Sequence, residues 1–229
     1  MKKLVVFLVL FFGIWSLQGQ IVYNPNIAIK PIPSMSIFKV EMTDTTTTIV
    51  VRMINDKQMP PFTLRTKNLF IRPVSDPDRI KLKRSVKAPF TPEKHAFTAL
   101  NEIFEFTLVF GPLPKNTKYF DLLEDLPKRE FYLQGIILDP PLNKMVSRGF
   151  QSFAKGDREG ALLAFKEMAE ADLYFEYGLA YFNIIYLLVQ LNRIPEAQEW
   201  YDKFKERFFY DKQLYENEFV RLGIRQKLK

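Results

Sequence analysis

The strongest constraint on the fold is a change of hydrophobic periodicity at Asp139-Pro140-Pro141. Before this point apolar residues recur at every second position, which is typical of half-buried β-strands, and after it they recur at helical spacing. Two adjacent prolines also end the last strand. The sequence therefore predicts an α+β chain of two modules. We expect an antiparallel β-sandwich over residues 20–138, a linker over 139–143 and a helical domain over 144–229.

The strand pattern is clearest at residues 102–110, where Phe104, Phe106, Leu108 and Phe110 share one face. Four more segments alternate in the same way: residues 37–42, 47–53, 118–123 and 131–138. Clusters of Pro, Gly, Asn and Asp separate them, as turns do. Counting less regular segments, the pattern gives roughly seven short strands, which is typical of an antiparallel sandwich.

Part of this module resembles a sandwich module of secreted bacterial envelope proteins. The resemblance rests on residues 106–114 (FTLVFGPLP), a following strand at 119–124 and a closing Gly135-Ile136-Ile137-Leu138. In that module a strand ends in an aromatic-Pro-Leu-Pro turn, and the final strand carries Gly-Ile. The resemblance covers about half of residues 20–229. It implies an immunoglobulin-like fold and export, and it brings no catalytic residue.

One segment of the first module is strongly basic. Residues 65–94 hold nine Lys or Arg residues against three acidic ones, a net charge of +6. The alternation of Lys81-Leu82-Lys83 directs cations to one face of a strand, and we select Lys81, Lys83, Arg84 and Lys87 as a candidate anion-binding set. The alternative is a solvated edge strand, in which lysines prevent edge-to-edge association.

Five helices are expected in the second module: residues 145–155, 157–169, 173–191, 195–208 and 211–227. Asp157 and Asp211 are suitable N-caps, because their carboxylates accept hydrogen bonds from exposed backbone N–H groups. Pro195 suits the first turn of a helix, where its missing N–H costs nothing.

The helical segment also repeats itself. Residues 156–161 (GDREGA) align with 192–197 (NRIPEA), and the period is close to the 34 residues of tetratricopeptide repeats. Gly149, Gly156, Ala161 and Phe165 fall at the spacing of small and aromatic positions in that family, although the second unit departs from it. Residues 142–229 thus resemble a tetratricopeptide-like domain. With only two units, we expect residues 211–227 to cap one end and the sandwich to cover the other.

The resemblance implies a groove lined by the first helix of each pair. Transferring the groove positions gives a candidate partner-binding set of Val146, Phe150, Phe153, Phe182, Tyr186 and Val189. Such a groove would take an extended or helical apolar segment of another protein. The alternative is that the capping helix or the sandwich buries these side chains.

The N-terminus predicts export. Lys2 and Lys3 precede fourteen uncharged residues, 4–17, which is too short for a spanning helix and suits a signal peptide over residues 1–19. An uncleaved anchor is the alternative. Export together with the absence of cysteine indicates the bacterial envelope, in the periplasm or associated with the outer membrane.

The composition removes most catalytic chemistries. Without cysteine, thiol catalysis and Cys-based metal sites are excluded, and the single histidine, His95, excludes a multi-His centre. No nucleophile elbow, zinc-binding helix or phosphate-binding glycine loop is present. We therefore expect no catalytic residue, no metal and no cofactor, and a structural role for His95. Nucleic acid is a poor candidate partner for an exported chain.

These observations predict a non-catalytic, exported protein that binds another envelope protein or acts as a scaffold, such as a subunit of an envelope assembly. The alternative is a binding module for an anionic envelope polymer or lipid head groups, through the basic segment 65–94. A third hypothesis, an unrecognised hydrolase, requires clustered carboxylates or His95 in a cleft.

Overall fold

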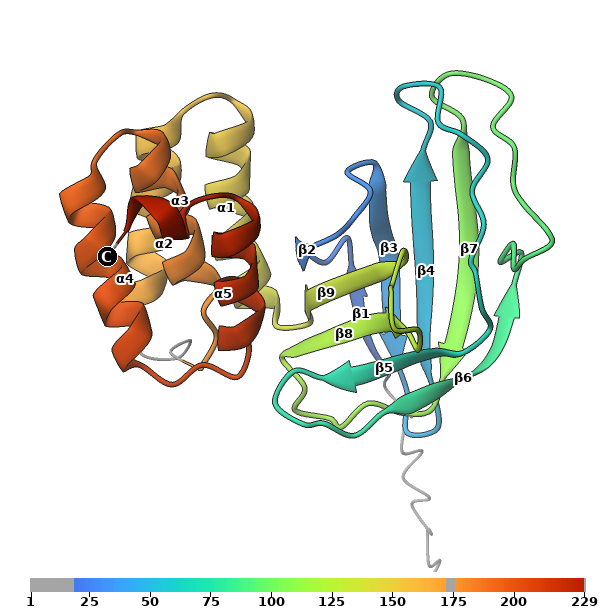
Figure 1. Ribbon diagram of the computed structural model, residues 1–229. Coiled ribbons are helices and arrows are strands. Elements are labelled where there is room, and N and C mark those ends of the chain that lie inside the picture. Colours follow the sequence, from blue (N-terminus) through green and yellow to red (C-terminus); the bar gives the residue numbers. More distant parts are fainter. Residues whose placement is uncertain (1–18, 172–175, 229) are drawn as a thin grey trace, which may run out of the picture.

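The computed structural model describes residues 19–171 and 176–228 (Figure 1). The signal peptide expected over residues 1–19 lies almost wholly outside the described residues and stays a prediction. Within the described ranges, no helix is long and apolar enough to cross a membrane. The protein is α+β, as expected: among residues 19–171 and 176–228, nine antiparallel strands come first and five helices follow.

The strands form one continuous sheet in the order β1-β3-β4-β7-β6-β5-β8-β9-β2. Their bounds are β1 Gln20–Tyr23, β2 Ile27–Ile29, β3 Met35–Met42, β4 Thr47–Ile54, β5 Leu69–Pro73, β6 Ile80–Val86, β7 Ile103–Phe110, β8 Tyr119–Glu124 and β9 Tyr132–Ile137. The sheet curls into a half-barrel, so that β3, β4 and β7 stand nearly upright while β5, β8 and β9 cross them (Figure 1).

The chain itself shows how far the sheet curls. β1 and β2 lie at opposite edges of the sheet, yet only residues 24–26 join them. Because a few residues span little more than about 14 Å, the two edges must approach each other. The Gln20 side-chain amide nitrogen accordingly donates to the Leu138 carbonyl at 3.3 Å, which links β1 to the end of β9.

The apolar side chains of the predicted alternating pattern form the core on the concave side of the curled sheet. Phe106, Leu108 and Phe110 of β7 are buried, and they face the concave side with Ile49 and Val51 of the paired strand β4. β8 differs, because all six of its residues are buried. The helices cover its outer face, and Tyr119 belongs to the helical core.

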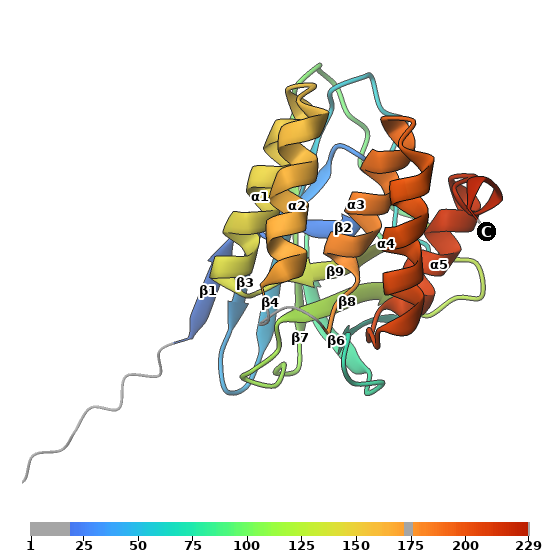
Figure 2. The same cartoon turned by 90° about the vertical axis from the view of Figure 1, so that its left-hand side faces the viewer.

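In the described part of the chain, five helices and a 3₁₀ turn follow the sheet: α1 Pro140–Ala154, α2 Arg158–Glu170, α3 Leu179–Gln190, α4 Ile194–Glu206, α5 Lys212–Arg221 and η2 Arg225–Lys227. They form a layer in front of the crossing strands when seen from the left of Figure 1 (Figure 2). α1 and α5 lie next to the sheet, and α4 lies on the far side (Figure 1).

The linker expected over residues 139–143 is the start of a helix. Asp139 is the N-cap of α1 and accepts a hydrogen bond from the Leu142 N–H at 2.8 Å, and Pro140 occupies the first turn. Asn143 of that turn accepts from the Asn26 N–H at 2.8 Å, and its side chain donates to the Ile137 carbonyl at 2.7 Å. The helical layer is therefore fixed to the sheet from its first turn.

The expected immunoglobulin-like sandwich is wrong. Strand spacing indicated how many short strands to expect, but it does not determine their order. β6 pairs with β7 on one side and with β5 on the other, and so joins what would be two separate sheets. The result is one curled sheet around one core rather than two sheets packed face to face.

The expected tetratricopeptide-like organisation is also wrong. Such a domain needs first helices with one open face, whereas α3 is buried on most sides, with eight of its twelve residues inside the core. The second unit carries Ile185 where the first has Gly149, and Ile185 is fully buried. The helical periodicity predicted the helices correctly, but it did not predict how they pack, and the tetratricopeptide assignment was wrong.

One local contact of the first hairpin explains how α1 and α2 pack. A Cβ on Gly149 would lie 2.6 Å from Cζ of Phe165, so only glycine lets the ring sit against the α1 backbone.

We expect Gly149→Leu to lower the free energy of unfolding by about 1–3 kcal/mol, measured by urea denaturation, because overpacking displaces the ring. Gln151→Leu, on the exposed side of the same helix, should change it by less than about 0.5 kcal/mol. Equal effects of the two changes would contradict this packing.

Candidate functional site

The basic segment 65–94 surrounds a split in the sheet. β5 and β6 pair through only two residue pairs, Ile71 with Ile80 and Phe70 with Lys81. Beyond Lys81 the two strands diverge, and β6 continues beside β7 alone, from Leu82 to Val86. The second half of β6 is therefore paired on one side only.

A β-bulge places the β6 cations. An uninterrupted strand would put Lys81 and Arg84 on opposite faces, but the register shifts between Leu82 and Arg84. Arg84 then pairs with Val109, and Ser85 pairs with the core residue Leu108. The core side of β6 thus carries Leu82 and Ser85, whereas Lys81 and Arg84 share the outer face.

Two kinds of basic residue occupy this region. Arg65, Arg72 and Arg79 form ion pairs with Glu130, Asp121 and Asp125 at 2.9, 3.1 and 2.8 Å. The other six cations have no carboxylate oxygen within 4.0 Å anywhere in the described part of the chain. These six, which we call the unpaired cations, are Lys67, Lys81, Lys83, Arg84, Lys87 and Lys94. Lys83 does donate to the Thr45 carbonyl at 3.3 Å.

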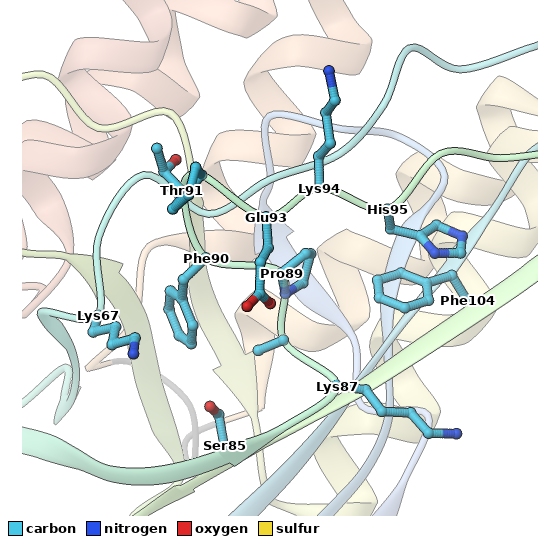
Figure 3. A pocket seen from close by; sticks show the side chains of 12 residues that line it. Lys67, Ser85, Lys87, Pro89, Phe90, Thr91, Glu93, Lys94, His95 and Phe104 are labelled. Carbon is cyan, nitrogen blue, oxygen red and sulfur yellow. The ribbon is translucent and has the colours of Figure 1, made fainter.

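Two hollows flank the split, and Lys67 lines both. The larger, of about 470 Å³, lies between β6 and residues 88–95. Figure 3 shows Ser85, Lys67 and Glu93 around its interior, while Lys87 and Lys94 project outward at its margins. The smaller, of about 210 Å³, opens where β5 and β6 diverge, and Lys81 lines it. The margins are therefore cationic, and the interior of the larger hollow holds one carboxylate.

His95 also borders the larger hollow, but neighbouring groups hold it in place. Its ring stacks on Phe104 with centroids 3.8 Å apart, and Nε2 lies 2.9 Å from Glu102 Oε1. Hydrogen bonds from the Thr98 N–H and hydroxyl lower the pKa of Glu102 to about 2. No serine or threonine hydroxyl among the described residues hydrogen-bonds the ring, so this pair lacks the nucleophile that a hydrolase of the serine type needs.

The candidate partner-binding residues of the helices differ in how far other helices cover them. Val146 and Val189 are buried, and the Phe182 ring lies 5.0 and 5.2 Å from those of Tyr215 and Phe219 in α5. Phe150 packs against Phe165, the ring that fills the α1–α2 contact. Phe150, Phe182 and Tyr186 are half-buried, and Phe153 is 40% exposed.

Sequence reasoning missed a polar cleft of about 350 Å³ between the sheet and α5, lined by Arg72, Asp121 and Asp211 among others. Asp121 is buried, accepts from Arg72 and from the Gly135 N–H, and burial raises its pKa. One signal was available: Asp121 and Glu124 are acidic residues inside an otherwise apolar strand. Their partners lie too far away in the sequence for spacing to reveal.

Asp211 was expected to cap the last helix, but its carboxylate makes no capping hydrogen bond to α5 and contacts another helix. Oδ1 accepts from the Gly178 N–H at 2.7 Å, at the start of α3. Burial raises the pKa of Asp211 to about 7 and the Asp121 carboxylate adds to this, while the hydrogen bond from Gly178 and the nearby Tyr215 hydroxyl oppose it. Asp211 therefore connects α3 to α5 at the junction with the sheet.

Neither cleft nor hollow resembles a metal centre: the described ranges contain no group of three or more His, Cys, Asp or Glu side chains placed to hold a metal ion. No protein-family model matches the chain, and no curated protein or solved structure matches it significantly. The proposed memberships in the tetratricopeptide and envelope-sandwich families thus find no support from related proteins either. Any functional conclusion rests on the site itself.

Proposed function

We propose that this is a non-catalytic binding protein that holds an anionic partner along β6. The observation that supports this proposal is the set of six unpaired cations around a split in the sheet. Three arginines of the same segment do find carboxylates, which leaves six of its nine cations without one. Concentrated positive charge attracts anionic partners and raises their association rate.

The β6 site is favoured over the helical surface as the partner-binding site. α5 packs on the Phe182 end of the expected groove, and Phe153, at 40% exposed, is the one exposed member of the set, while the other five are buried or half-buried. β6, in contrast, presents cations next to two hollows. Export to the bacterial envelope remains part of the proposal, supported by the N-terminal sequence. An anionic envelope component, whether protein, polymer or lipid head group, is the partner class that this charge fits.

Charge reversal tests the proposal. We expect Lys81→Glu/Lys83→Glu to weaken binding of fluorescein-labelled polyglutamate by about tenfold or more at an ionic strength of about 0.01 M, where screening is weak. The difference should shrink near 0.15 M, because the Debye length falls to about 8 Å. Fluorescence anisotropy measures both.

The matched control is Lys57→Glu/Lys155→Glu, which makes the same change of net charge at two exposed lysines, one in the sheet module and one at the end of α1. If the two double variants lose affinity equally, binding follows net charge and the β6 site is refuted. Circular dichroism spectra of both variants should match that of the unaltered protein.

A further inference from the structure

The free side of β6 indicates more than a site for diffuse charge. We propose that the anionic partner is an extended acidic segment of polypeptide, which adds as a strand to the open edge of β6 between Leu82 and Val86. The proposal rests on the function proposed above and names the class of partner and its mode of binding.

The backbone of β6 supplies the first part of the argument. A strand directs its N–H and C=O groups alternately to its two sides, and a side without a neighbour can pair with another chain. β7 covers one side of Leu82–Val86, and β5 has left the other. No other described backbone group hydrogen-bonds to that side. The open edge is about 17 Å long, enough for about five residues of a partner.

The side chains supply the second part. Lys81, Arg84 and the exposed Val86 lie on the outer face of β6, whereas Leu82 and Ser85 face the core side. A strand added beside β6 would alternate in the same way. Its outward side chains would lie next to cations, and its inward ones would enter the larger hollow beside Phe90 and Phe104.

Glu93 restricts which anion fits. Its carboxylate points into the larger hollow (Figure 3), so a chain with negative charge on every residue would be repelled there. A segment that alternates acidic with apolar residues avoids this repulsion and uses both faces. The chemistry of the site therefore favours a segment of alternating acidic and apolar residues over a chain charged at every residue, such as polyglutamate, which would bind through the cations of the outer face.

The alternative is that these cations only prevent the edge of β6 from associating with other strands. Lysines and a bulge on an edge strand prevent association between copies of one chain, because like charges repel. That repulsion excludes a second copy of β6 as the occupant. It becomes attraction when the incoming strand is acidic, so a lysine-rich edge can reject its own copies and still accept this partner.

Backbone methylation of a synthetic ligand tests the proposal. The probe is an acetylated, fluorescein-labelled peptide of about seven residues alternating glutamate and valine, long enough to cover the open edge. Two further peptides carry N-methyl groups on alternate residues, one along each edge of the strand. We expect one methylated peptide to bind about tenfold or more weakly and the other to bind nearly like the parent, because only one edge of the ligand pairs with β6. Amide hydrogen exchange within Arg84–Val86 should slow in the parent complex.

The outcomes separate this inference from the function on which it rests. If both methylated peptides bind like the parent, or if exchange within Arg84–Val86 does not slow, strand addition is wrong. Tighter binding of dextran sulfate than of the peptide, with the same dependence on Lys81 and Lys83, would also overturn it in favour of a polymer partner. In each of these cases the anion-binding function survives. Only the failure of the charge-reversal comparison removes both.

Discussion

Glu124→Ala is expected to lower the free energy of unfolding by about 3–5 kcal/mol, since it leaves one buried and two part-buried backbone donors without an acceptor. Glu124 is fully buried at the end of β8. Its carboxylate accepts from the backbone N–H groups of Arg65, Glu130 and Phe131 at 3.2, 3.1 and 3.1 Å. Each unsatisfied buried donor costs about 1–3 kcal/mol, and truncation also leaves a cavity.

Two further variants make this prediction specific. Glu124→Gln keeps one acceptor oxygen and brings an NH₂ group against backbone donors, so it should lose less than alanine but still destabilise the fold. Glu130→Ala removes the exposed partner of Arg65 from the same turn and should cost less than about 1 kcal/mol. Urea denaturation followed by circular dichroism measures all three. A Glu124→Ala protein no less stable than Glu130→Ala would show that the carboxylate does not organise these turns.

The loops that Glu124 holds lie beside the β6 site, so its effect extends to binding. The Arg65 N–H bond fixes the chain just before Lys67, which lines both hollows. A destabilised turn at Arg65 would therefore displace one of the six unpaired cations. This dependence of the site on a distant strand is one reason why sequence alone could not define it.

Local periodicity predicted the elements well. The expected segments at 37–42, 47–53 and 102–110 became β3, β4 and β7 with bounds shifted by two residues or fewer. Buried and more exposed residues alternate along β4 as its sequence predicts, because successive side chains of a strand point to opposite faces of the sheet. The helices were also found, with larger differences at three ends. α1 begins at Pro140 rather than residue 145, and α5 ends at Arg221 rather than residue 227. α3 begins at Leu179, and residues 173–175 of the helix expected over 173–191 lie outside the described residues.

Long-range pairing was not predictable in the same way. The order of strands depends on contacts such as Gln20 with Leu138 and β5 with β6, which no local pattern encodes. The sandwich and tetratricopeptide interpretations failed because each took a correct set of elements and assigned it a familiar arrangement. For the helices, the burial of α3 on most sides was the decisive difference.

The candidate sites show the same contrast between what a local pattern predicts and what depends on long-range contacts. Lys81, Lys83, Arg84 and Lys87 were selected from charge alone, and they lie exposed without carboxylate partners, although the bulge that brings Arg84 to the face of Lys81 was not foreseen. The aromatic set stays a prediction as a partner-binding site, and α5 packs on one member of it, Phe182. Whether the β6 cations bind a partner is the question that the charge-reversal experiment decides.

Asp211→Asn is expected to stabilise the protein at pH 8 by about 4 kcal/mol and to have little effect near pH 4. In the unfolded chain an aspartate has a pKa of about 3.9. Burial raises the pKa of Asp211 to about 7 in the folded protein, so the folded state binds the proton more tightly. The stability that this proton contributes is fully present below about pH 4 and is lost as pH rises to about 7. Asparagine removes the titration and keeps an oxygen for the Gly178 N–H.

The difference in unfolding free energy between the variant and the unaltered protein, measured by urea denaturation from pH 4 to 8, isolates this group from all others that titrate. The difference should grow with pH and level off above about pH 7. Asp44→Asn, at an exposed carboxylate, should stay within about 0.5 kcal/mol throughout. A constant difference for Asp211→Asn would show that Asp211 does not titrate in this range. Because Asp211 joins the starts of α3 and α5 beside Asp121 of the sheet, a difference that grows as expected would mean that ionisation of Asp211 weakens the packing at this junction.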